Sequence, residues 1–256
     1  MARDKGVLIV FDLVSTLTDA APRYVQAFIE AAEQAGAPTP DRDALAAMLG
    51  NKNLGEITDH FIGPMDAATR KKFMGQCNQS CDALLTRPGW TEHLFPNVRE
   101  AVEALHLQGA TLGIYTGTRE DALDLQLKYH GLTAEFDYRY VRGKDNDRDA
   151  GKSTTQIKEA QLQSIVAAYR ADQGTDAPVI VIGDSAADAA AAAEQGLFFI
   201  GFAVNDAKKA EMDKAGVKLV ITDFGQLPDL TDRLMHPAVN DNLPRLSPSV
   251  TQKPKP

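Results

Sequence analysis

Short apolar runs alternate with amphipathic stretches along most of the chain. The runs cover residues 6–11, 110–115, 178–183, 197–203 and 217–221, and each is rich in β-branched or aromatic side chains. A continuous apolar run of this length is typical of a strand buried on both faces. The stretches at 97–108, 119–130, 153–169 and 185–195 have helical periodicity. This alternation predicts an α/β protein whose parallel sheet is covered by helices on both faces.

One segment departs from this alternation. Residues 20–90 contain amphipathic helical patterns at 21–34, 41–49 and 66–85, a polar loop at 50–55, and no strand-like run. An all-helical insertion after the first strand is expected above the carboxyl ends of the strands, where open α/β sheets bind ligands. We therefore predict an α/β core of residues 1–19 and 91–235 and a helical cap of residues 20–90. Residues 236–256 contain five prolines and little to bury, so we expect them to be disordered.

Composition and charge narrow the class of partner. The 256 residues are 44% hydrophobic and 24% charged, which is ordinary for a globular protein. A net charge of -8 repels polyanions, so we expect neither nucleic acid nor an anionic membrane as a partner. With two cysteines there is no disulfide framework, and we expect a reducing, cytoplasmic location. The sequence leaves the oligomeric state open.

Polar residues follow three of the predicted strands. Asp12 ends the first run, Thr116-Gly117-Thr118 follows the second, and Asp184 with Asp188 follows the third. A carboxylate at a strand end can be a nucleophile or a hard-metal ligand, although it can also simply cap a turn. The Thr-Gly-Thr segment can bind phosphate, although Thr118 can equally be a helix N-cap. Two carboxylates four residues apart at a helix start favour Mg²⁺, and capping explains only one of them.

Lysines supply the positive charge that a phosphate site needs. Lys152, in Gly151-Lys152-Ser153, precedes a predicted helix and can act as a point charge on a phosphoryl group. Lys158 is the other candidate, but its place within the helix predicts a surface position. Arg23, just past the first motif, can help to bind an anionic substrate, but we expect it on an exposed helix face.

The order of these motifs resembles the haloacid dehalogenase (HAD) superfamily, over residues 6 to 230. The resemblance implies a Rossmann-like core with a cap of the C1 type, and Asp12 as the nucleophile that becomes an aspartyl phosphate. It implies that Thr116 and Lys152 hold the phosphoryl group. It further implies that substrate is bound by Thr16, Gly117, Thr118 and Lys52. The Mg²⁺ ligands that it implies are Asp12, the main-chain carbonyl of Val14, Asp184 and Asp188.

The first motif departs from the family pattern at one position. The phosphatases usually read D-x-D-G-T, whereas this chain has Asp12-Leu13-Val14-Ser15-Thr16. The second Asp of that pattern protonates the leaving alcohol and later activates water, and Val14 can do neither. We therefore predict a Mg²⁺-dependent phosphohydrolase for a small phosphorylated substrate, with reduced activity on poor leaving groups.

Two other functions stay open at this point. The chain also resembles phosphonoacetaldehyde hydrolases, which have a small apolar residue in place of Val14 and cleave a C–P bond through a Schiff-base lysine; Lys52 is the candidate here. A catalytically silent HAD fold that binds a phosphorylated ligand or a partner protein is the third hypothesis.

Overall fold

The computed structural model describes residues 6–49, 54–174 and 177–236. The chain divides into two compact units, one formed by Met1–Leu17 with Leu94–Pro256 and the other by Thr18–His93. These borders lie within three residues of those predicted for core and cap. The predicted disorder of the tail falls on residues 237–256, which lie outside the described residues, as do positions 50–53 of the polar loop.

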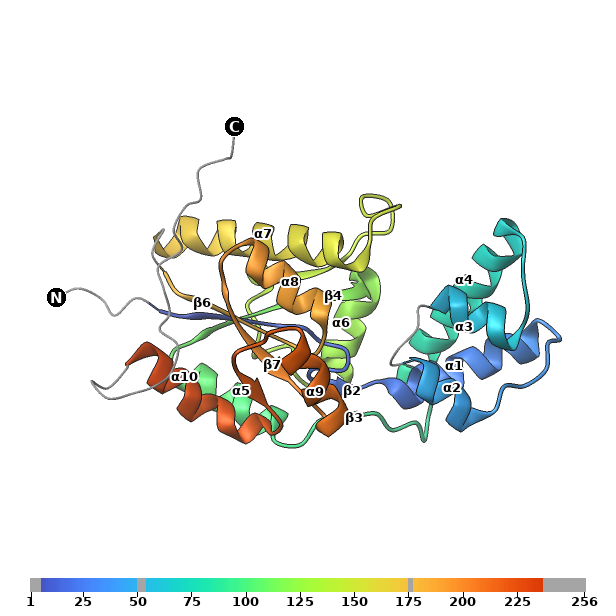
Figure 1. The fold of residues 1–256 in the computed structure, drawn as a ribbon, viewed down its shortest axis with the longest axis horizontal. Coiled ribbons are helices and arrows are strands. Elements are labelled where there is room, and N and C mark those ends of the chain that lie inside the picture. The colour runs from blue at the N-terminus through green and yellow to red at the C-terminus, as the bar shows by residue number, and fades with distance from the viewer. Residues whose placement is uncertain (1–5, 50–53, 175–176, 237–256) are drawn as a thin grey trace. The chain divides into compact units, whose positions relative to one another are not determined.

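The first unit is a parallel sheet with helices on both faces (Figure 1). Its strand order is β5-β4-β1-β6-β7-β8. The strands are β1 (Leu8–Phe11), β4 (Thr111–Arg119), β5 (Val141–Lys144), β6 (Val179–Gly183), β7 (Phe198–Phe202) and β8 (Val220–Ile221). The predicted α/β class and parallel sheet are confirmed.

Strand β1 shows why the central strands are apolar throughout. Its four residues are all buried, and they alternate between two cores. Ile9 and Phe11 pack with α5 (Val98–Leu107), α6 (Glu120–Tyr129) and α10 (Leu227–Met235). Leu8 and Val10 pack with α7 (Thr154–Gln173) and α8 (Ala186–Glu194) on the other face. Both faces are covered, so neither tolerates polar side chains.

The second unit is built from helices. They are α1 (Ala21–Gln34), α2 (Arg42–Leu49), α3 (Leu54–Phe61) and α4 (Ala67–Thr86), and they enclose a core around Phe28 and Phe73. The segment from Leu54, expected as loop, begins helix α3. A separate two-stranded sheet pairs β2 (Thr18–Asp19) with β3 (His93–Leu94).

The arginine expected on an exposed face of α1 is buried in this helical unit. Arg23 is 1% exposed, and its Nε donates to Oε2 of Glu92 over 2.5 Å. Burial lowers the pKa of Arg23, but the nearby Tyr24 and Glu92 outweigh it, so the net pKa is raised. The interpretation of Arg23 as a surface residue is therefore wrong, and its role is to pair with a buried glutamate.

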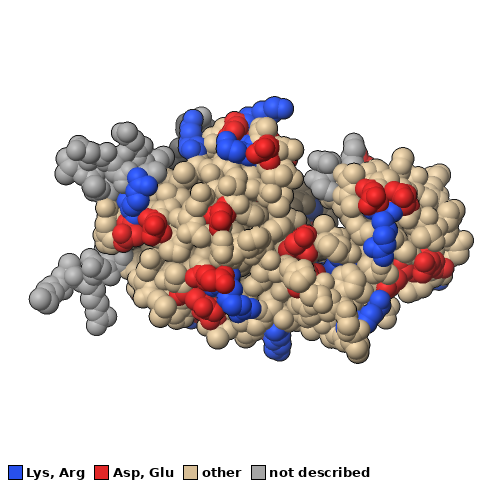
Figure 2. All heavy atoms as spheres, turned by 90° about the horizontal axis from the view of Figure 1, so that it is seen from below, with Lys and Arg blue, Asp and Glu red and all other residues tan. Residues whose placement is uncertain are grey.

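The surface carries both signs of charge. On the face drawn in Figure 2, acidic and basic side chains lie next to one another. Lys209 and Asp213 form one of the surface ion pairs of the protein, 2.9 Å apart. Among the described residues, no helix combines the length and the apolar character needed to cross a membrane.

Candidate active site

The carboxyl ends of β1 and β6 bring the predicted carboxylates together. The backbone N–H of Asp12 donates to the carbonyl of Ile182 over 2.8 Å, which continues the β1–β6 ladder by one residue. Asp184 follows β6 directly, and Asp188 lies in the first turn of the next helix. Each of the three carboxylates has an oxygen within 4.8 Å of one on each of the others. Parallel strands end at one edge of a sheet, which brings Asp12 and Asp184 together, and the helix that follows β6 adds Asp188.

Lys158 is the lysine that reaches these carboxylates. Its Nζ lies 3.2 Å from Oδ1 of Asp12 and 2.6 Å from Oδ1 of Asp188, and the side chain is 7% exposed. The surface position predicted for this residue is therefore wrong. Lys158 lies on the buried face of α7 in line with Leu162 and Ile165, at the spacing of an apolar helical stripe.

Lys152, which was predicted to hold the phosphoryl group, contacts a different carboxylate. Its Nζ donates to Oδ1 of Asp149 over 3.0 Å, and its side chain is 37% exposed. Asp149 in turn accepts from the backbone N–H of Asp145, so the contact closes a polar turn before α7. The structure thus assigns the position beside Asp12 to Lys158, six residues further along.

Asp188 is saturated by donors from the protein. Its Oδ1 accepts from the Tyr115 hydroxyl over 2.7 Å and from Lys158 over 2.6 Å. Its Oδ2 accepts from the backbone N–H and the hydroxyl of Ser185, at 3.0 and 2.5 Å. The pair forms the capping box of α8, so capping does explain the second aspartate, contrary to the sequence argument. Asp188 therefore orients Lys158 and leaves Asp12 and Asp184 as the carboxylates open to a metal.

Gly183 makes this arrangement possible. A Cβ at position 183 would lie 2.5 Å from the carboxyl carbon of Asp188. No side chain fits in that space, so only glycine lets the carboxylate approach the end of β6 so closely.

Thr16 links the two remaining carboxylates. Its hydroxyl lies 3.1 Å from Oδ2 of Asp12 and 3.3 Å from Oδ1 of Asp184. A hydroxyl has one proton, so it donates to one of them at a time. Thr16 was predicted to contact substrate, but it contacts these carboxylates. Ser15 before it has φ 64°, in the left-handed region.

The carboxyl end of β4 is fixed through its backbone. The side-chain amide of Gln161 accepts from the N–H of Thr116 over 3.1 Å and donates to its carbonyl over 2.9 Å. The Thr116 hydroxyl accepts from the N–H of Thr118 over 3.2 Å. The N-cap of α6 is Arg119, so the alternative role of Thr118 as a helix cap is wrong. The Thr118 hydroxyl is buried and has no hydrogen-bond partner, while Gly117 is exposed.

The site has an excess of negative charge. Burial, together with Asp188 and Asp184, raises the pKa of Asp12 to about 8, although Lys158 opposes the shift. Burial and Asp188 raise the pKa of Asp184 to about 6. For Lys158, burial lowers the pKa, but Asp12 and Asp188 outweigh it and raise it overall. The two carboxylates that remain open, Asp12 and Asp184, fit a divalent cation, which favours carboxylate oxygens.

Comparison with known proteins places the chain in a family. The model of the haloacid dehalogenase-like hydrolases matches residues 7–196, which is most of the chain. This protein belongs to that family. The resemblance drawn from the motifs is confirmed, and so is the fold that it implies.

Individual relatives of this HAD hydrolase are distant. Tyrosine-protein kinase PtkA of Mycobacterium tuberculosis is 23% identical, over 89% of this chain and 72% of its own. Phosphoglycolate phosphatase of Vibrio vulnificus is 26% identical, over 53% of this chain and 61% of its own. The crystal structure of a predicted phosphoglycolate phosphatase from Haemophilus somnus has a TM-score of 0.70 at 21% identity. It covers 89% of this chain and 98% of its own.

Sequence reasoning missed several residues of the HAD hydrolase site. Tyr115 and Ser185 bond the Asp188 carboxylate, and Gln161 bonds the backbone of Thr116. None of the three was predicted, and Lys158 was predicted to lie on the surface. The sequence did contain a signal for two of these residues. Lys158 and Gln161 lie on the apolar face of the helix over residues 157–166, where a helix that covers a sheet normally has only apolar side chains. Lys52, the candidate Schiff-base lysine, lies outside the described residues.

Proposed function

We propose that this HAD hydrolase is a Mg²⁺-dependent phosphohydrolase that acts on a small phosphorylated molecule. One observation carries the proposal: the Asp12 carboxylate lies at the end of the central strand, 3.2 Å from a buried lysine and within 4.8 Å of the Asp184 carboxylate. A phosphoryl group needs this combination of nucleophile, fixed positive charge and metal ligands.

Asp12, the main-chain carbonyl of Val14 and Asp184 would hold the cation. Bound there, Mg²⁺ would neutralise charge on the phosphoryl oxygens and on the two carboxylates. Asp188 supports the site indirectly, because its oxygens are already occupied by Lys158, Tyr115 and Ser185.

The reaction would begin with in-line attack by an Asp12 oxygen on phosphorus. The bond between phosphorus and the leaving oxygen breaks, and an aspartyl phosphate forms. Lys158 is placed to stabilise charge on the transferred group, and Thr116 and Thr118 come from the strand end beside it. Water then attacks phosphorus, which releases inorganic phosphate and regenerates the carboxylate.

Val14 limits both steps. No carboxylic acid is present at position 14 to protonate an alkoxide or to activate water. Leaving groups that depart without a proton should therefore react best. The direct experiment is a Mg²⁺-dependent screen of acyl, aryl and alkyl phosphates with wild-type protein and Asp12→Asn. Turnover by the wild type alone supports the proposal, whereas equal turnover by both proteins contradicts it.

Phosphoryl transfer to an acceptor hydroxyl is the second candidate. A slow attack by water would leave the aspartyl phosphate available to another acceptor, and the relative PtkA is described as a tyrosine kinase. Formation of phosphotyrosine from ATP on a tyrosine-containing peptide tests this candidate, with Asp12→Asn as the control. Release of inorganic phosphate with no labelled peptide would favour the hydrolase.

C–P cleavage through Lys52 and a purely binding role stay as predictions. Borohydride trapping with phosphonoacetaldehyde separates the first of these from phosphate-ester hydrolysis, because only an imine is reduced to a stable adduct. Turnover of any phosphate ester excludes the second.

A further inference from the structure

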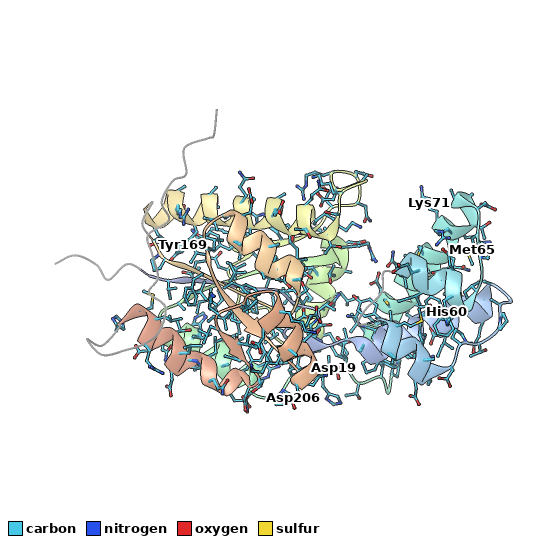
Figure 3. The ribbon with its side chains drawn as sticks, viewed as in Figure 1. Asp19, His60, Met65, Lys71, Tyr169 and Asp206 are labelled. Carbon is cyan, nitrogen blue, oxygen red and sulfur yellow. The ribbon has the colours of Figure 1, made fainter. Side chains whose placement is uncertain are left out.

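A second lysine, Lys208, reaches the carboxylate cluster from another helix. It lies in the first turn of α9 (Asp206–Lys214), and its Nζ is 3.7 Å from Oδ2 of Asp184. Strand β7 runs beside β6, with Gly201 opposite Gly183, so α9 begins at the edge of the sheet where Asp184 lies. Figure 3 labels Asp206 at this start of the helix.

Lys208 has a fixed backbone and an adjustable side chain. Its N–H donates to the side chain of Asn205 over 2.9 Å, which caps α9. Its Nζ also lies 3.3 Å from Oε2 of Glu211, a half-exposed residue one turn further along. The Lys208 side chain is 20% exposed, whereas that of Lys158 is 7% exposed and is bonded at 2.6 Å. The ammonium group of Lys208 can therefore move between partners that differ in exposure.

We propose that Lys208 is an anion-binding residue that Asp184 holds only while no divalent cation is bound. The inference rests on the proposed function, in which Asp184 is a metal ligand. A cation at Asp184 neutralises the charge that attracts Lys208 and repels its ammonium group. A phosphate dianion bound to that cation attracts the same group. Lys208 then turns from Asp184 or Glu211 to the phosphoryl oxygens or to an anionic group beside them.

Removal of this charge should change two affinities in opposite directions. Without Lys208, a divalent cation no longer displaces a competing ammonium group, so it should bind about tenfold more tightly. With the cation bound, inorganic phosphate loses one charged donor and should bind about tenfold more weakly. A residue with only a structural role would weaken both.

Calorimetric titration of Lys208→Gln separates these outcomes. Mg²⁺ is titrated into the metal-free protein, and inorganic phosphate is then titrated at saturating Mg²⁺. Lys209→Gln is the matched control, because Lys209 pairs with Asp213 and not with Asp184. Lys208→Arg keeps the charge and should retain most of the phosphate affinity.

The expected result is tighter Mg²⁺ and weaker phosphate for Lys208→Gln, with wild-type values for Lys209→Gln. Unchanged or weaker Mg²⁺ binding overturns the inference, and so does unchanged phosphate binding. Asp184→Asn distinguishes this failure from failure of the proposed function. If the wild type binds Mg²⁺, Asp184→Asn does not, and Lys208→Gln equals the wild type, only the inference fails. If the wild type binds no Mg²⁺, the metal site itself fails.

Discussion

The Nζ of Lys158 lies 3.2 Å from Oδ1 of Asp12, and the two residues are 146 positions apart in the chain. Asp12 directly follows the central strand, whereas Lys158 lies in the first half of α7. This contact places a fixed positive charge on the proposed nucleophile.

Loss of the Lys158 charge should therefore abolish most of the activity. We expect Lys158→Met to lower kcat for nitrophenyl phosphate by about 10²–10³-fold, the usual effect of removing one preorganised donor from a charged transition state. Lys152→Met is the matched control and should retain activity within about threefold, because Lys152 bonds Asp149. Steady-state kinetics on both variants provide the comparison. A larger loss of kcat in Lys152→Met than in Lys158→Met would assign the catalytic role to Lys152.

The stability of the metal-free protein should fall as pH rises from about 4 to about 8. Burial raises the pKa of Asp12 from 3.8 to about 8 and that of Asp184 from 3.8 to about 6. In this range the folded state holds more protons than the unfolded state, so the free energy of unfolding decreases with pH. In the proposed site Mg²⁺ would bind the ionised carboxylates, so it should remove most of this decrease. Urea unfolding at a series of pH values, with EDTA or with Mg²⁺, measures how the free energy of unfolding changes with pH in each condition. With EDTA, this decrease should be smaller for Asp12→Asn than for the wild type.

Much of the fold was predictable because the apolar runs are buried on both sides. Residues 8–11 are all buried and pair with strands on either side. Strand β5 was missed because Val141-Arg-Gly-Lys144 lies at an edge of the sheet and carries no apolar run. Helix α3 was missed because it has eight residues and follows a polar loop.

The aspartates of the site could be predicted, but the lysine could not. Asp12 and Asp184 follow directly from strand ends, which meet at one edge in any parallel sheet. Lys158 comes from a helix, and its position depends on how α7 lies across the sheet. Lys152 is an equally plausible phosphate-binding lysine in the sequence, but in the structure it bonds Asp149. Helical periodicity alone does not show which of two lysines is desolvated by its neighbours.

Ser15→Gly should stabilise the protein. Ser15 has φ 64°, and the family's usual first motif has glycine at this position. A side chain in the left-handed region costs about 1 kcal/mol or more, which exceeds the extra unfolded-state entropy of glycine. We expect the free energy of unfolding to rise by about 0.5–1 kcal/mol in chemical denaturation. Ser153→Gly, at a helix N-cap with φ -71°, is the control and should cause a small loss. A loss of stability in Ser15→Gly would show that its side chain makes a contact worth more than the strain.

Val14→Asp should restore the missing acid. Wild-type protein should turn over acyl and nitrophenyl phosphates but process alkyl phosphates about 10²–10⁴-fold more slowly than an enzyme with the acid. Val14→Asp should recover much of the alkyl phosphate rate and change the nitrophenyl rate much less. A leaving-group series on both proteins measures this. A flat dependence on leaving-group pKa in the wild type would mean that another residue supplies the proton.

Covalent phosphorylation of Asp12 is the most direct measurement of the central claim. The protein is mixed with an acyl phosphate and Mg²⁺, quenched in acid, and digested for mass spectrometry. The account predicts the mass of one phosphoryl group on the peptide that contains Asp12, discharged by hydroxylamine. Asp12→Asn should show none. Turnover with no adduct on this peptide, or equal turnover by Asp12→Asn, would contradict the claim that Asp12 is the nucleophile.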